Sequence, residues 1–318
     1  MKKEVLLSKT YVVVLLAMLC CLLWGSATPS IKIGYELFHI DVEDTASIML
    51  FAGIRFILAG VMVLLFQFVT SRDTLKWHQG TAKRIMILAL TQTFGQYFFF
   101  YIGLAHTTGV KGAIITGFNV FLAILVSSLW FHFESLNRKK VIGCLLGFVG
   151  IVVINLTPNS EMNAGFSILG EGFVFLAQVA YAFSSALIKK FSAIDHAVML
   201  SGSQFLLGGS LLALTGVFMG GHITIYGIEC VLILCYLAFI SAVAYTVWGI
   251  LLKYHPVSKV SIYGFMNPMF GVFLSAVVLG EGNQAFSVQG LLALCLVVLG
   301  IVVVNRVKHS DDSIVKNI

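Results

Sequence analysis

Arg55 is the residue of this sequence whose position most strongly suggests a binding role. It lies in an apolar run that starts near residue 46. In a helix that rises about 1.5 Å per residue, Arg55 would lie ~14 Å from the start of that run. A charge at such a depth in a membrane costs about 2.5–3.5 kcal/mol on insertion scales and normally faces a cavity or a partner. Two roles stay open: Arg55 binds an anionic group such as an amino-acid carboxylate, or it braces carbonyls freed by an interruption of the first helix at residues 25–29.

Amide and aromatic side chains supply further candidates. Gln92 and Gln96 are four residues apart, as are Tyr97 and Tyr101, so in a helix the two pairs form adjacent stripes. Such stripes suit a cavity that binds a polar ligand, although Tyr is also common at membrane interfaces and amides also join helices. Other candidates of the same residue types are Trp24, Asn119, Gln178, Tyr181, Gln204, Tyr245, Trp248, Tyr263 and Asn267.

The sequence lacks the residues that several kinds of chemistry require. No Asp or Glu lies near the middle of an apolar run, where proton relays are usually found, so exchange or facilitated movement is favoured over proton antiport. The Gly-x-x-x-x-Gly-Lys-Ser/Thr motif of ATP-driven systems is absent. The six cysteines lie inside apolar runs without metal-site spacing. We therefore expect no cofactor, no metal and no catalytic residue.

The composition indicates that these residues are held by membrane helices. Hydrophobic residues make up 59% of the 318 residues and charged residues 11%, with a mean hydropathy of +0.98. In ordinary soluble domains, hydrophobic residues make up about 45–50% and charged residues about 25%. The net charge of +6 could suggest a nucleic-acid partner, but the basic residues lie between apolar runs. The expected surroundings are a lipid bilayer, and nucleic acid is not an expected partner.

Ten apolar runs are long enough to cross a bilayer, which takes roughly 20 residues per helix. They lie at about 10–33, 46–69, 83–104, 109–131, 139–156, 168–189, 197–219, 229–252, 257–279 and 287–305. If the N-terminus is cytoplasmic, every Lys and Arg except Lys32, Arg55 and Lys111 falls on the cytoplasmic side. We therefore predict a multi-pass protein of the cell membrane with both termini cytoplasmic.

The sequence also contains a weak internal repeat. Residues 117–121 resemble residues 264–268, and without a gap the same offset pairs Glu134 with Glu281 and Gly143 with Gly290. Other matched pairs are residues 150–155 with 300–305, Trp24-Gly25 with Tyr181-Ala182, and Arg55-Phe56 with Gln204-Phe205. Because five is an odd number, the second set of five helices would enter the membrane from the opposite side. The predicted fold is all-α, with ten transmembrane helices arranged as two inverted five-helix repeats.

These motifs resemble those of the drug/metabolite transporter superfamily, specifically the EamA-like permeases. The resemblance rests on Trp24-Gly25 with Pro29, Arg55-Phe56, Asn267-Pro268 and Gly280-Glu281, followed by Gly290 and Gly300. It implies two EamA repeats, which we assign to residues 10–156 and 168–305. It also implies a central cavity with helices 5 and 10 at the periphery, and export or exchange of small metabolites.

The predicted function is therefore that of a secondary transporter of small metabolites such as amino acids, working by alternating access about a midplane cavity between the repeats. The residues predicted to bind substrate are Trp24, Arg55, Gln92, Gln96, Tyr97, Tyr101, Asn119, Tyr181, Gln204, Tyr245, Trp248 and Asn267. The alternatives are a passive channel and a membrane-embedded enzyme, which would need convergent polar groups that the sequence does not offer. The oligomeric state stays open.

Overall fold

The computed structural model describes residues 9–70, 75–107, 112, 115–155, 166–278 and 288–306, and these residues form helices and connections without any strand. Of the predicted features, Lys111, Gly280, Glu281 and the span limits at 109, 156, 279 and 287 lie outside the described residues. A helical segment lies in each of the ten predicted ranges. Hydrophobic runs of this length form helices because a helix satisfies its own backbone hydrogen bonds without water.

The first half of the chain, residues 10–155, is mostly helical. In chain order its elements are α2 (Thr10–Leu37), α3 (Thr45–Thr70), α4 (Thr81–Leu88), the π-helix η2 (Ala89–Gly95), α5 (Gln96–Ala105), α7 (Asn119–Leu125), the π-helix η3 (Val126–Trp130) and α8 (Arg138–Asn155). The segments α4, η2 and α5 follow one another without a break, so the third predicted helix contains a π-helical section. Sections of this kind are rare and are frequently found at functional sites.

The second half, residues 166–306, follows a similar order. Its elements are the π-helix η4 (Ile168–Gly172), α9 (Phe173–Phe191), α10 (Ala197–Phe218), α11 (Ile228–Tyr254), α12 (Val257–Ser261), the 3₁₀-helix η5 (Ile262–Phe265), α13 (Met266–Val278) and α15 (Val288–Asn305). The ninth predicted helix is thus divided into α12, η5 and α13.

Six of the described helical stretches are long and apolar enough to cross a membrane: Thr10–Leu37, Thr45–Thr70, Thr81–Leu104, Ile168–Phe191, Ala197–Phe218 and Ile228–Tyr254. Shorter apolar helices cover Ile115–Trp130 and Leu291–Asn305. The chain is therefore a multi-pass membrane protein by the length and composition of its helices.

The predicted interruption of the first helix at residues 25–29 is wrong. Helix α2 continues through Pro29 to Leu37. Proline has no backbone N–H and so removes one helical hydrogen bond, but membrane helices tolerate this loss where neighbouring helices pack closely. Such packing is present, because a Cβ added to Gly25 would lie 2.6 Å from Cβ of Phe270 in α13. The proposed bracing role of Arg55 loses the helix break on which it depended.

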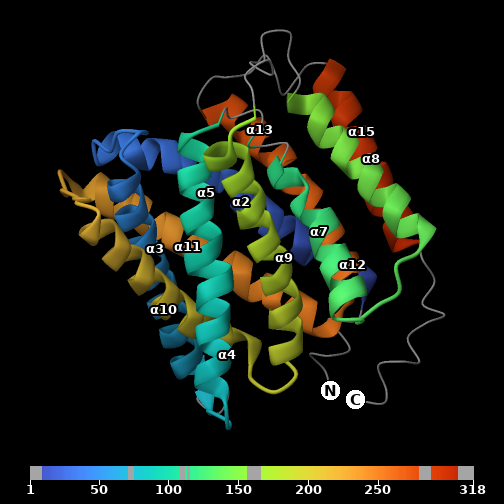
Figure 1. Cartoon of the computed structure of the whole chain (residues 1–318), viewed down its shortest axis with the longest axis horizontal. Helices are drawn as coiled ribbons and strands as arrows, with labels where there is room; N and C mark the ends of the chain where they lie inside the picture. The colour runs from blue at the N-terminus through green and yellow to red at the C-terminus, as the bar shows by residue number, and fades with distance from the viewer. Residues whose placement is uncertain are drawn as a thin grey trace.

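The helices pack in a pattern that relates the two halves of the chain. Helix α3 lies along α10, and α8 lies along α15 as a separate pair (Figure 1). Helix α2 packs against α11 and α13, and correspondingly α9 packs against α5 and α7. The crossing of α3 and α10 is close: a Cβ at Gly60 would lie 2.8 Å from the carbonyl oxygen of Gly202, and one at Gly209 would lie 2.9 Å from that of Gly53. Small residues at such crossings let two membrane helices approach closely.

The connections gather at two ends of the helix bundle. We call the lower end in Figure 1 the basic end; it carries the loops at residues 75–80, 131–137, 192–196 and 255–256. We call the other end the acidic end; it carries the loops at residues 38–44 and 219–227 and the start of η4. The names follow the charged residues beside these loops, Lys76, Arg84, Lys140 and Lys189 at the first and Glu36, Asp41, Glu43 and Asp44 at the second.

Candidate central binding site

Arg55 is buried at the centre of the predicted site. Only 4% of its surface is exposed. Its guanidinium carbon lies 4.5 Å from the ring centroid of Phe56 and 5.7 Å from that of Tyr97. The phenol groups of Tyr35, Tyr97, Tyr101 and Tyr245 all lie within electrostatic range of the guanidinium. In the described part of the chain no carboxylate pairs with Arg55. Aromatic faces attract a cation, but they do not neutralise it as a carboxylate would.

Aromatic side chains from both halves of the chain surround this cation. The hydroxyl oxygens of Tyr97 in α5 and Tyr245 in α11 are hydrogen-bonded at 2.7 Å. The Trp24 ring of α2 meets the rings of Tyr245 and Trp248 edge-on, with centroids 5.1 and 5.0 Å apart. The ring centroids of Tyr97 and Tyr101 are 5.8 Å apart. The structure therefore brings these predicted residues together from four helices, α2, α3, α5 and α11.

Buried polar atoms without a partner lie on several of the predicted binding residues. Among the described residues they include Nε1 of Trp24, Nε of Arg55, Oε1 of Gln96 and Nε1 of Trp248. Three of the four are hydrogen-bond donors. A buried polar atom that lacks a partner costs about 1–3 kcal/mol. A ligand that carries acceptor oxygens beside the donors would remove that cost.

Gln204 of α10 makes a polar contact with η2. It is fully buried in α10, and its Oε1 accepts a hydrogen bond of 2.5 Å from the Thr93 hydroxyl of η2. Its Nε2 has no partner in the described structure. Gln92, also in η2, is 7% exposed. The Gln204 carbonyl thus joins two helices, as amides commonly do in membranes.

The remaining predicted residues are less closely grouped. Tyr181 of α9 is 9% exposed, and its phenol group is within electrostatic range of Tyr97 and Tyr245. Asn119 begins α7 and Asn267 is the second residue of α13. Helix α7 packs on α9 and α12, and α13 packs on α2, so the main packing partners of these two helices do not include α3.

Three aromatic residues of the centre were missed by the sequence analysis. They are Tyr35, Phe56 and Phe205; the last two stack across the α3–α10 crossing with centroids 5.4 Å apart and an interplanar angle of 26°. The internal repeat held a signal for Phe56 and Phe205 but not for Tyr35, because it pairs Arg55-Phe56 with Gln204-Phe205. Two residues matched by a repeat and lying on paired helices are expected to meet near the axis that relates the halves.

A buried carboxylate ties the two halves together at the basic end. Asp195, in the loop before α10, accepts hydrogen bonds from Nε of Arg84 at 2.5 Å and from the Thr81 hydroxyl at 2.8 Å, and its Oδ1 lies 3.0 Å from Nδ1 of His78. Burial by itself raises the pKa of Asp195, but the hydrogen bonds from Arg84, His78 and Thr81 outweigh burial and hold the pKa below its ordinary value.

A second buried carboxylate joins the halves at the same end. Glu134, between η3 and α8, forms an ion pair of 2.8 Å with Lys140, and the two side chains are 7% and 8% exposed. Its carboxylate also accepts hydrogen bonds from the Ser127 hydroxyl at 2.6 Å and from the backbone N–H of Ser258 at 2.9 Å. Burial by itself raises the pKa of Glu134. The charge of Lys140 and the side-chain hydrogen bonds from Lys140, Ser127 and Ser258 outweigh burial and hold the pKa below its ordinary value.

The contacts described between the halves at the acidic end are with neutral groups, except for one with the carboxylate of Glu171. The Ser47 hydroxyl accepts a hydrogen bond of 3.0 Å from the backbone N–H of His222. The Cys230 thiol donates to the carbonyl oxygen of Leu37 at 3.3 Å. The Thr107 hydroxyl donates to Glu171 at 2.8 Å. Both ends thus use a carboxylate, but the described cation–carboxylate pairs lie at the basic end.

These observations define the class of the protein: a multi-pass, all-helical membrane protein whose two halves meet at a buried cation inside an aromatic cluster. More specifically, the chain belongs to the EamA-like transporter family, whose family model matches residues 12–156 and 168–306. It is therefore a membrane transporter of the drug/metabolite transporter superfamily, and the resemblance read from the sequence is confirmed.

Individual proteins support the same assignment. An uncharacterized transporter of Bacillus subtilis, YetK, is 26% identical over 84% of this chain and 81% of its own length. A Salmonella typhimurium protein named a probable amino-acid metabolite efflux pump is 24% identical over 86% of this chain and 89% of its own. A solved crystal structure with 19% sequence identity superposes with a TM-score of 0.76, covering 93% of this chain and 96% of the other, which shows that the fold is shared.

Proposed function

We propose that this transporter moves small metabolites, such as amino acids or related compounds, by alternating access about the centre that contains Arg55. The observation that carries the proposal is the buried guanidinium without a carboxylate partner, enclosed by aromatic residues of both halves. A buried charge in a membrane marks a substrate pathway by default. The guanidinium matches a carboxylate geometrically as well as electrically, because it offers donors in a planar fork.

The packing pattern supports a division of the chain into two inverted five-helix repeats, residues 10–156 and 168–305. If the first five predicted helices correspond in order to the last five, α2 is the counterpart of α9, α3 of α10 and α5 of α11. The contact of α2 with α11 then corresponds to that of α9 with α5, and α3 packs against its own counterpart α10. Inverted repeats provide two nearly equivalent states, each open to one side of the membrane. On this proposal all ten helical segments cross the bilayer, and the peripheral pair α8 and α15 holds the repeats together.

The substrate class is inferred from the groups that surround Arg55. The Trp24 and Trp248 indole N–H groups and Arg55 Nε offer donors to a carboxylate, while the aromatic rings offer contact area to an apolar or aromatic side chain. The remaining predicted binding residues, Gln92, Gln96, Asn119, Gln204 and Asn267, would contact polar parts of the substrate or shape the path to it. The name of the Salmonella typhimurium relative agrees with this class.

We further propose that the basic end faces the cytoplasm of a cell membrane, with both termini on that side, because Lys and Arg are retained there during insertion. No Asp or Glu of the described helices lies beside Arg55, and the proposed cycle is therefore exchange or facilitated export rather than proton antiport. In this cycle the contacts of Asp195 and Glu134 between the halves would break when the basic end opens.

Counterflow in proteoliposomes tests the role of Arg55. The purified protein would be reconstituted with an internal pool of unlabelled amino acids, and uptake of labelled phenylalanine, glutamate and lysine would be measured. We expect saturable counterflow of at least one amino acid, a loss of at least 100-fold for Arg55→Gln, and a smaller loss for Arg55→Lys, which keeps the charge but not the fork. Arg138→Gln, at the exposed start of α8, is the matched control and should keep the wild-type rate. Wild-type rates in both Arg55 variants would refute the binding role.

A further inference from the structure

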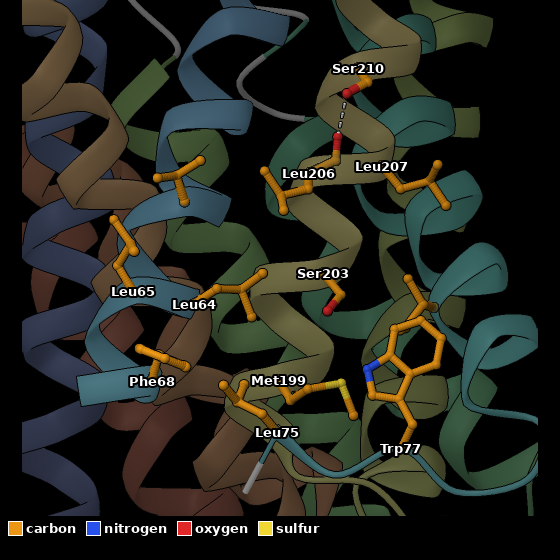
Figure 2. Close-up of a pocket in the computed structure, with 12 residues that line it drawn as sticks. Leu64, Leu65, Phe68, Leu75, Trp77, Met199, Ser203, Leu206, Leu207 and Ser210 are labelled. Atoms are coloured by element: carbon orange, nitrogen blue, oxygen red, sulfur yellow. Dashed lines mark hydrogen bonds between the residues drawn. The ribbon is translucent and has the colours of Figure 1, made fainter. Parts of the chain in front are cut away.

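An apolar groove of about 770 Å³ lies on the outer surface of the bundle, away from the central site. Figure 2 shows that α3 contributes Leu64, Leu65 and Phe68 to one wall, that α10 contributes Met199 and Ser203, and that Trp77 lies at one end. Ser210 also lines the groove, but its hydroxyl donates to the carbonyl oxygen of Leu206 at 2.7 Å. The groove therefore presents a mainly hydrophobic surface.

The length of the groove matches one leaflet of a bilayer. Along α10 it extends from Met199 to Ser210, which corresponds to ~16 Å at about 1.5 Å per residue. The hydrocarbon core of a bilayer is about 30 Å thick, so the groove covers about half of it. Trp77 is 64% exposed, and tryptophan is enriched where the hydrocarbon meets the headgroups. The groove thus runs from the headgroup level of the basic end to the middle of the membrane.

Two lysines lie close in the sequence to residues that line this groove. Lys76 lies between Leu75 and Trp77, which both line the groove, and Lys83 lies two residues before Ile85, which also lines it. Both lysine side chains are exposed. An exposed basic side chain at the surface of a membrane attracts an anionic headgroup.

We propose that the groove is a binding site for one anionic phospholipid of the leaflet at the basic end. An acyl chain would lie between α3 and α10, with the phosphate beside Lys76 and Lys83. The proposal is independent of the transported substrate, because none of the residues that line the groove belongs to the proposed central site. A lipid bound here would contact the α3–α10 pair whose other face carries Arg55 and Gln204, and so would lie against the helices on which the site is built.

Quenching of Trp77 fluorescence by brominated lipids tests the site. The full-length protein in detergent micelles would be titrated with phosphatidylglycerol or phosphatidylcholine that carries bromine on an acyl chain. The contribution of Trp77 is the difference between the wild type and Trp77→Phe. We expect that contribution to be half-quenched at an at least fivefold lower mole fraction of phosphatidylglycerol than of phosphatidylcholine. Equal quenching by the two lipids would overturn the proposed headgroup recognition, and equally strong quenching by a brominated fatty acid would overturn the choice of a phospholipid.

Two sets of variants locate the lipid within the groove. Ser203→Phe adds bulk to its wall and should raise the half-quenching fraction of phosphatidylglycerol at least fivefold, whereas Leu214→Phe, at an exposed position of the same helix, should leave it unchanged. The double variant Lys76→Gln, Lys83→Gln changes only exposed side chains and should remove the preference for phosphatidylglycerol, which keeps the proposal testable if Ser203→Phe does not fold. Unchanged quenching in a folded Ser203→Phe protein, or an unchanged preference in the double variant, would refute the site.

A dimer without bound lipid in native mass spectrometry would show that a second copy of the chain covers the groove instead.

Discussion

The two ends of the helix bundle join the halves of the chain by different interactions. At the basic end, Asp195 and Glu134 are carboxylates that contact the other half and are also held by a cation, Arg84 or Lys140. At the acidic end, the described contacts between the halves are neutral at Ser47 and Cys230, and one hydrogen bond runs from the Thr107 hydroxyl to the Glu171 carboxylate. Hydrogen bonds to charged groups contribute about 1.5–3 kcal/mol each, against about 0.5–1.5 kcal/mol for neutral ones.

This difference indicates which end is harder to open in the described conformation. The halves can separate at one end only if the contacts there exchange partners or become solvated. Charged contacts that are buried resist separation more strongly than neutral ones, because an unpaired buried charge is costly. We therefore expect the basic end to be closed more tightly than the acidic end, and to respond to pH.

The largest effect is expected at Glu134. Glu134→Ala leaves the 8% exposed Lys140 side chain without its carboxylate and removes the acceptor for Ser127 and for the N–H of Ser258. Breaking a buried ion pair by removing one partner costs about 3–5 kcal/mol. Thermal unfolding in detergent should show a correspondingly large loss of stability. Glu36→Ala, at an exposed position of the acidic end, is the control and should change stability by less than about 0.5 kcal/mol. Similar losses in both variants would contradict the comparison.

Asp195→Asn should have the next largest effect. The variant keeps an amide oxygen for Thr81 but loses the charge that Arg84 and His78 face. We expect a loss of about 1.5–3 kcal/mol, the range for hydrogen bonds to a charged group, measured by thermal unfolding at neutral pH. Asp41→Asn, in the exposed loop of the acidic end, provides the control for an Asp-to-Asn change. A negligible loss for Asp195→Asn would show that the Arg84 contact does not stabilise the closed basic end.

The same aspartate predicts how stability depends on pH. Because its pKa is lowered in the folded protein, its contribution is present above the pKa of the unfolded chain, about 3.9 for Asp, and is lost as the pH falls through the folded value. The stability difference between the wild type and Asp195→Asn should therefore be constant near neutral pH and shrink below about pH 4. A difference that grows on acidification would mean that the pKa of Asp195 is raised rather than lowered.

Residue types and spacing were sufficient to predict much of this molecule. The helical segments follow from apolar runs that are long enough to cross a bilayer, and the central cluster follows in part from the Tyr97 and Tyr101 stripe and from the depth of Arg55. The sequence could not show that Tyr97 bonds to Tyr245 or that Gln204 bonds to Thr93, since these partners are 148 and 111 residues apart. Such pairs depend on how the halves pack. The continuity of α2 through Pro29 depends on packing as well, and a local helix-breaking rule cannot include it.

The smallest effect is expected at Ser47 of the acidic end. Ser47→Ala removes the acceptor for the backbone N–H of His222 and the hydroxyl's own bond to the Asp44 carboxylate, while the N–H of Ser47 keeps its hydrogen bond to Asp44. One neutral hydrogen bond between the halves, with a bond to the partly exposed Asp44 that contributes little, predicts a loss of about 0.5–1.5 kcal/mol. Thr70→Ala, which removes only an exposed bond to Phe66 in the same helix, is the control for loss of a hydroxyl. Thermal unfolding of the two variants separates the contact between the halves from a local one. If Ser47→Ala destabilised the protein as much as Asp195→Asn, the two ends would be held equally strongly, and the described conformation would not favour opening at the acidic end.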